Sequence, residues 1–91
     1  MEELKASQPQ MKGQKVLVVG LGATGVATAQ FLQGRGARVT VSEARDEAAV
    51  LPALRDLSGR GIIVETGGHR LETFLAADLI VVSPAVSPDV P

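Results

Sequence analysis

A glycine-rich segment and a later acid are the residues whose types and spacing favour ligand chemistry. Residues 20–25 read GLGATG, which matches G-x-G-x-x-G, and Glu43 stands 21 residues after Gly22. Glycines at this spacing let the backbone turn tightly and approach a phosphate, and free N–H groups at a helix start attract its negative charge. A following acid accepts hydrogen bonds from a ribose or a base N–H. The pattern therefore predicts a binding site for a diphosphate-containing nucleotide rather than only a compact turn.

Other residues with catalytic potential are few. Val26 and Ala27 stand where a Walker-type phosphate loop carries Lys and Ser or Thr, so the segment is not such a loop. The chain has no cysteine, and His69 has no second histidine or paired carboxylate at metal-ligand spacing. We assign His69 no role and expect neither a metal site nor a catalytic residue. The chain is interpreted as a binding domain without chemistry of its own.

An alternation of strands and helices must position the glycines and the acid. Short β-branched and apolar runs predict strands at residues 15–19, 38–42, 62–65 and 78–83. Apolar residues at helical spacing predict helices at 24–34, at 46–57 with Pro52 near its first turn, and at 70–76. In the first helix, the spacing predicts an apolar face made of Thr24, Ala27, Thr28, Phe31 and Leu32.

This order of elements predicts an α/β fold. We expect a Rossmann-like parallel sheet with helices on both faces and four strands in the order 3-2-1-4. In such sheets, the loops at the carboxyl ends of the strands beside the switch point line a crevice. The loops at 20–25, 43–45 and 83–86 therefore come together, and we expect the ligand site there.

Length and composition restrict the class of function. The 91 residues allow at most one domain, with a flexible lead-in at 1–11 and the folded unit at 12–91. A formal net charge of -1 and only two aromatic residues argue against nucleic acid as a partner. Apolar runs are far shorter than the roughly 18 residues of a membrane span, and the polar start MEELKASQPQ is unlike a secretory signal. We expect a cytoplasmic location and no membrane partner.

The joint pattern of motifs resembles the N-terminal domain of the D-glutamate-adding Mur ligases. The resemblance rests on GxKV at 13–16, GLGxTG at 20–25, Glu43 with Arg45, and ADLIVxSP at 77–84. It implies a domain that holds UDP-N-acetylmuramoyl-L-alanine in a longer, ATP- and Mg²⁺-dependent ligase that adds D-glutamate in peptidoglycan synthesis, and so serves cell wall biogenesis, cell shape and cell division. It also implies that this chain, truncated before the ATP and D-glutamate sites, is inactive and binds no cofactor alone. We expect a monomer.

The resemblance also implies a role for individual residues in holding the UDP-sugar. Ala23 and Thr24 would meet the diphosphate, and Glu43 the uracil imide N–H. Arg45 would line one rim of the base pocket, with the Ser-Pro pair at 83–84 on its other side. The full set that the resemblance assigns to UDP-sugar binding is Gly22, Ala23, Thr24, Gly25, Glu43, Ala44, Arg45, Ser83, Pro84 and Ala85.

Two residues depart from the family pattern, and two other functions stay open. Ala44 stands where the family often has Thr, which removes a hydroxyl contact to uracil, and Ala85 stands where it often has Gly, which hinders close backbone approach. One alternative is an NAD(P)-binding half-domain of an oxidoreductase, with Glu43 on the adenosine ribose. The other is a nucleotide-sensing regulatory domain, in which the ligand changes a contact with a partner.

Overall fold

The computed structural model describes residues 11–83, which form a parallel sheet with helices on both faces. The strands are β1 (Lys15–Val19), β2 (Arg38–Ser42), β3 (Ile63–Glu65) and β4 (Leu79–Val82), in the order β3-β2-β1-β4. All three pairings are parallel. The predicted fold class and the predicted strand order are confirmed.

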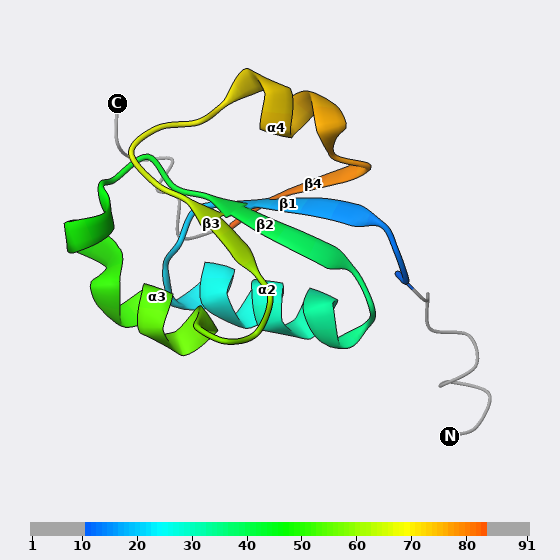
Figure 1. Cartoon of the computed structure of the whole chain (residues 1–91), viewed down its shortest axis with the longest axis horizontal. Helices are drawn as coiled ribbons and strands as arrows, with labels where there is room; N and C mark the ends of the chain where they lie inside the picture. Colours follow the sequence, from blue (N-terminus) through cyan, green and yellow to red (C-terminus); the bar gives the residue numbers. More distant parts are fainter. Residues whose placement is uncertain (1–10, 84–91) are drawn as a thin grey trace.

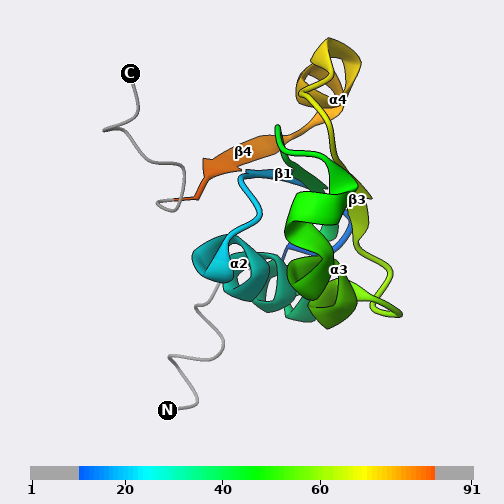
Figure 2. The ribbon, with the colours of Figure 1, turned by 90° about the vertical axis from the view of Figure 1, so that its left-hand side faces the viewer.

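The helices cover the two faces of the sheet unequally. Figures 1 and 2 show α2 (Ala23–Gly34) and α3 (Leu51–Leu57) side by side on one face, and α4 (Leu71–Ala76) alone on the other. The central strand β1 is buried on both sides, as its unbroken apolar run predicts, because Val16, Leu17 and Val18 are at most 1% exposed. The main core lies under α2 and α3, where side chains of β1, β2 and both helices pack together.

Helix α2 occupies the predicted residues but buries a different face. The buried residues are Gly25, Val26, Ala29 and Leu32, whereas most of the expected face is exposed. The predicted period was right and its phase was wrong, because the small residues Gly25 and Ala29 let the helix lie close to the sheet. Phe31 is instead 63% exposed, with the Arg35 Cζ 5.8 Å from the centre of its ring.

The second predicted helix is divided into two pieces. A 3-10 turn, η1 (Glu47–Val50), is capped by Asp46, whose carboxylate accepts the Ala49 N–H at 3.1 Å. Helix α3 then begins with Pro52 in its first turn, where the missing N–H costs no hydrogen bond. The division follows from the proline, because its ring would clash with the preceding turn of a continuous helix.

Asp78 fixes the start of β4 against the start of β1. Its carboxylate accepts the Lys15 N–H at 2.9 Å, and its own N–H donates to the Lys15 carbonyl at 2.7 Å. The register that follows pairs Val16 with Leu79. At the other end of the pairing, the Ser83 N–H donates to the Val19 carbonyl at 2.9 Å. Asp78 therefore helps to determine where Ser83 lies.

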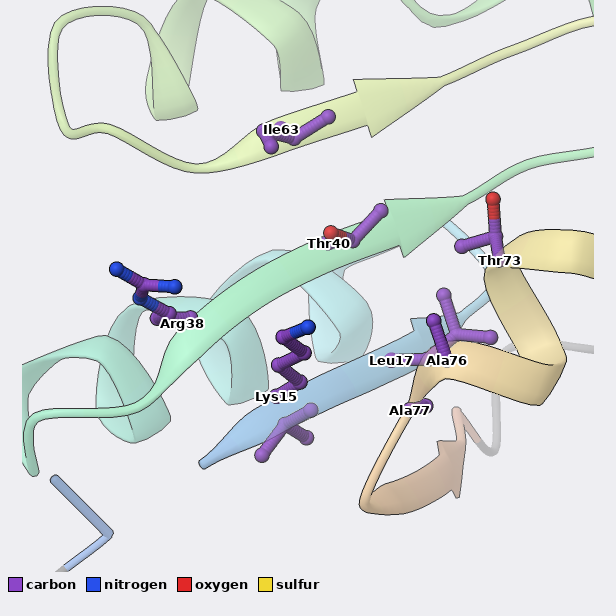
Figure 3. A pocket seen from close by; sticks show the side chains of 9 residues that line it. Lys15, Leu17, Arg38, Thr40, Ile63, Thr73, Ala76 and Ala77 are labelled. Carbon is purple, nitrogen blue, oxygen red and sulfur yellow. The ribbon is translucent and has the colours of Figure 1, made fainter. Parts of the chain in front are cut away.

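A small groove of about 170 Å³ lies on the α4 face, near the amino ends of the strands (Figure 3). Lys15, Arg38 and Ile63 begin β1, β2 and β3 there, and Thr73 and Ala76 border it from α4. Of the residues expected to bind ligand, none of those within 11–83 lines this groove. The groove exists because α4 is only six residues long and covers part of its face.

Candidate functional site

The glycine loop joins β1 to α2, as the sequence predicts, and depends on a close backbone contact at Gly25. A Cβ at this position would collide with the Gly20 carbonyl oxygen. The Gly20 N–H donates to the Ser42 carbonyl at 2.9 Å, so the loop is also fixed to the end of β2. Glycine at position 25 thus lets the first turn of α2 lie directly against the end of β1.

The first turn of α2 presents backbone N–H groups to the crevice. Gly22 is the N-cap and provides no side-chain cap, and the first turn contains no acidic residue. The hydrogen-bond ladder of the helix begins with the Val26 N–H, which donates to the Gly22 carbonyl at 2.9 Å. The N–H groups of residues 23–25 precede this ladder and lie at the positive end of the helix dipole, which suits an anion such as a diphosphate.

Glu43 connects the end of β2 to the glycine loop. Its Oε1 accepts the Leu21 N–H at 2.8 Å and Arg45 Nη2 at 3.1 Å. Its Oε2 accepts the Arg45 N–H at 2.8 Å and Arg45 Nε at 3.0 Å. Arg45 Nη2 also donates to the Leu21 carbonyl at 3.2 Å. Both polar groups of the Leu21 peptide backbone are therefore held by this pair of side chains.

The charge of Glu43 is stabilised by the same contacts. The hydrogen bond from the Arg45 side chain, together with the Arg45 and Leu21 N–H groups, lowers the pKa of Glu43 to about 2, although burial of the carboxylate acts in the opposite direction. Hydrogen bonding to Glu43 raises the pKa of Arg45. The pair is therefore fully charged at neutral pH.

The turn after β3 holds the segment 43–45 from the other side. The Glu43 N–H donates to the Glu65 carbonyl at 2.8 Å. The Gly67 N–H donates to the Arg45 carbonyl at 2.8 Å, and the Gly68 N–H to the Glu43 carbonyl at 3.3 Å. Gly67 has φ +82°, which glycine adopts without the strain of a side chain. The sheet, through this turn, fixes the backbone of the predicted base-binding segment.

His69, to which the sequence assigned no role, has a structural one. Its Nδ1 lies 2.5 Å from the Oγ of the buried Ser42, and its ring meets the edge of Phe74 with centroids 5.8 Å apart. These contacts join the turn after β3 to the end of β2 and to α4. Sequence reasoning missed them because Ser42 and His69 are 27 residues apart and nothing local to either residue marks the contact.

The structure brings most of the predicted site residues together. Gly22, Ala23 and Arg45 line one side of a groove of about 400 Å³ that continues between α2 and α3. Ser83 is buried behind the glycine loop, with its Oγ 3.5 Å from the place a Gly25 Cβ would take. Thr24 and Ala44 are exposed next to these residues. Pro84 and Ala85 lie outside the described residues.

Comparison with known proteins identifies the family. Residues 14–91 match the family described as Mur ligase MurD-like, N-terminal domain. The chain belongs to this family. The resemblance carried by the motifs is thereby confirmed, and the oxidoreductase alternative is not favoured.

Relatives of this MurD-like N-terminal domain are named UDP-N-acetylmuramoylalanine--D-glutamate ligase. The chain is 51% identical over 81 residues to the protein of Geotalea uraniireducens and 55% identical over 82 residues to that of Acidobacterium capsulatum. These alignments cover 89% and 90% of this chain, respectively, but only 18% of each relative. The MurD-like domain is therefore compared with a small part of a much longer ligase.

A solved structure shares the fold of this MurD-like domain. SirC, precorrin-2 dehydrogenase, is similar with a TM-score of 0.63 and 26% identity, over 84% of this chain and 37% of the SirC chain. This similarity confirms the Rossmann-like architecture.

The described part of the MurD-like domain lacks two kinds of feature. Within residues 11–83, no three His, Asp or Glu side chains come together in a way that could hold a metal ion. Over the same range, every helix is too short or too polar to cross a membrane.

Proposed function

We propose that this chain binds UDP-N-acetylmuramoyl-L-alanine as the N-terminal domain of an ATP-dependent ligase that adds D-glutamate in peptidoglycan synthesis. The observation that carries the proposal is the position of the uncapped first turn of α2 beside the fixed 43–45 segment. This arrangement occurs in a family whose relatives are named for that ligase reaction.

The diphosphate would lie over the first turn of α2. The N–H groups of Ala23 and Thr24 and the exposed Thr24 hydroxyl can donate to phosphate oxygens. No carboxylate in this turn opposes the negative charge. Arg45, with a side chain 55% exposed at the edge of the groove, adds positive charge nearby. Gly22 and Gly25 contribute by letting the ligand and the end of β1 approach the backbone closely.

The uracil would lie against the segment 43–45, with the segment 83–85 opposite. Ala44 is exposed between the two fixed residues Glu43 and Arg45, so its peptide group is available to a base. Ser83 supports the glycine loop from below, and Pro84 and Ala85 follow it in sequence. A direct contact from the uracil imide to Glu43 would require one of the present donors to leave the carboxylate.

ATP and Mg²⁺ do not fit the described residues. Val26 and Ala27 provide neither the Lys nor the hydroxyl of a phosphate loop, and residues 11–83 contain no group of acids that could hold a metal ion. We place ATP, Mg²⁺ and D-glutamate on other parts of a longer protein, and we propose that the 91-residue chain alone is inactive and monomeric. Because two of its substrates, the UDP-sugar and ATP, are nucleotides, the complete ligase would act in the cytoplasm.

Titration of the 91-residue chain tests the proposal. UDP-N-acetylmuramoyl-L-alanine, UDP, NADH and NADPH are added separately, and amide chemical shifts are followed by NMR. We expect both uridine ligands to shift the amides of residues 23–25 and 43–45, while residues around the α4 groove, such as Ile63, stay unchanged. A response to NADH without a response to either uridine ligand would reject the proposal in favour of the oxidoreductase alternative.

A further inference from the structure

His69 is attached to the buried end of β2 through a side-chain hydrogen bond. Its Nδ1 lies 2.5 Å from the Oγ of Ser42, and Ser42 is 0% exposed. A buried hydroxyl that loses its partner destabilises the folded state, so this contact is costly to break. Ser42 directly precedes Glu43, and its carbonyl accepts the Gly20 N–H at 2.9 Å. The contact with His69 therefore ends at the point where β2 meets both loops of the proposed site.

The turn after β3 holds the backbone of the segment 43–45. The Gly67 N–H donates to the Arg45 carbonyl at 2.8 Å, and the Gly68 N–H donates to the Glu43 carbonyl at 3.3 Å. These two bonds fix the carbonyls at both ends of the segment. The proposed function places the uracil against this segment, so the position of the turn determines the shape that the base meets.

The two glycines do not fix the turn by themselves. Gly67 has φ +82° and Gly68 has φ +140°, and a Cβ on either residue would meet no atom within 4 Å. Glycine loses much conformational freedom when it becomes ordered, so a Gly-Gly turn in open space needs another restraint. The helix that follows, α4, is a weak one, because none of its residues is buried.

His69 supplies a restraint where the turn ends. Its ring meets the edge of Phe74, with centroids 5.8 Å apart, and its Nδ1 is bonded to Ser42. The Thr73 hydroxyl donates to the Glu65 carboxylate at 2.8 Å, which connects α4 to β3. The contact of His69 instead connects the turn to β2, the strand that leads into the base-binding segment.

We propose that His69 is a positioning residue for uridine binding. Its hydrogen bond with Ser42 anchors the turn 66–69, and this turn holds the segment 43–45 in the geometry that receives the base. The inference rests on the proposed function and names a residue outside the set expected to touch the ligand. His69 acts through the backbone of the turn, so the role needs no contact between the imidazole and the nucleotide. The hydrogen bond, rather than the ring contact with Phe74, carries the effect.

Two variants separate the hydrogen bond of His69 from its ring. His69→Asn keeps a polar group close to the position of Nδ1, and Asn has both a donor and an acceptor, so it suits either direction of the bond with Ser42. His69→Phe keeps an aromatic ring beside Phe74 and loses the hydrogen bond. In calorimetric titrations of the 91-residue chain, UDP should bind about fivefold more weakly to His69→Phe and less than about twofold more weakly to His69→Asn. Unchanged affinity in His69→Phe would overturn the inference, as would equal losses in the two variants.

A control and a partner variant complete the design. Leu71→Ala shortens a side chain that is 73% exposed, two residues after His69, and should leave UDP binding unchanged. Ser42→Ala removes the hydroxyl and should weaken UDP binding as much as His69→Phe does. The two losses should not add when both substitutions are combined, because each removes the same bond. Additive losses, or a loss in Leu71→Ala as large as that in His69→Phe, would reject the inference.

A measurement without ligand separates failure of this inference from failure of the proposed function. In the free chain, His69→Phe should shift the Gly67 and Gly68 amides and accelerate hydrogen exchange of the Gly67 amide about fivefold, with the buried Val18 amide unchanged. If the original chain binds no UDP, the proposed function fails, and these amides still decide whether His69 anchors the turn. Unchanged amides at both glycines would contradict the anchoring. If His69→Phe does not fold, Ser42→Ala replaces it in both measurements, with the same expected results.

Discussion

Arg45 Nε donates to Glu43 Oε2 at 3.0 Å, and the two side chains of this ion pair differ in their contact with water. The guanidinium side chain is 55% exposed, whereas the carboxylate side chain is 7% exposed. An ion pair between two exposed side chains contributes little to stability, because water screens both charges. Here the carboxylate is sheltered and also accepts two backbone N–H groups, so its ionisation is coupled to folding.

The first prediction concerns acid pH. The pKa of Glu43 falls from its ordinary value of 4.5 to about 2 on folding. The carboxylate therefore stabilises the fold fully above pH 4.5, and this contribution is lost as the pH falls from 4.5 to 2. At about 1.4 kcal/mol per pKa unit the shift sets an upper limit of about 3 kcal/mol, which exposure of Arg45 reduces to about 1–2 kcal/mol.

Urea unfolding at pH 7, 4.5 and 2 measures this contribution. Glu43→Gln is the control, because the amide cannot ionise in this range. The free energy of unfolding should fall by about 1–2 kcal/mol more in the original chain than in the variant between pH 4.5 and 2. Parallel curves for the two proteins would contradict the prediction.

The second prediction compares two glycines of α2. Gly25→Ala should lower the free energy of unfolding by about 2–3 kcal/mol. The new Cβ would collide with the Gly20 carbonyl oxygen, and because this oxygen belongs to the backbone, no side-chain rotation can relieve the collision. Gly34→Ala should raise it by about 0.5–1 kcal/mol, since its Cβ would meet open space and the unfolded chain loses freedom. Thermal or urea unfolding measures both, and equal effects at the two positions would refute the argument.

The third prediction concerns the turn that supports the segment 43–45. Gly67→Ala should cost about 1–2 kcal/mol, because φ +82° is unfavourable for an L residue although no atom lies near the new Cβ. Gly67→Asn should cost less, since Asn tolerates this region better. Amide shifts of Glu43 and Arg45 in the alanine variant report whether the strain reaches the site. An alanine variant as stable as the original chain would show that the turn does not require a positive φ at position 67.

The fourth prediction concerns the start of β4. Asp78→Ala removes the acceptor of the Lys15 N–H and should cost about 1 kcal/mol. Asp78→Asn keeps an oxygen at the same place and should cost less than half as much. Hydrogen exchange of the Lys15 amide distinguishes the variants, because it should accelerate in the alanine variant only. Equal acceleration in both would indicate that the charge, rather than the hydrogen bond, matters.

The sequence predicted the strands and their order because each strand is a short apolar or β-branched run bounded by glycine or polar residues. The loops that form the site followed from topology alone. The buried face of α2 could not be predicted, because the helical spacing of apolar residues does not determine which face of the helix packs against the sheet. The close contact between Gly25 and Gly20, which fixes that phase, joins two separate elements.

The details of the site were also beyond the sequence. Glu43 was singled out by its distance from the glycines, but that spacing is the same whether the carboxylate faces a ligand or the Leu21 N–H. For Arg45, the resemblance implied only a position at one rim of the base pocket. Its actual partners depend on the direction of a long side chain, which only the packed loops determine. His69 was missed for the same reason.

The sheet order has a consequence for how the chain folds during synthesis. β1 is the first strand to be made, yet it lies between two others. One of its edges is covered when β2 is made. The other edge stays uncovered until β4 is made, because Asp78, the partner of Lys15, comes 63 residues later in the sequence. Until then, that edge of β1 is open to strands of other chains. Ser83 follows all four strands in the sequence, so the proposed nucleotide site is not complete before the last strand of the described sheet has been made.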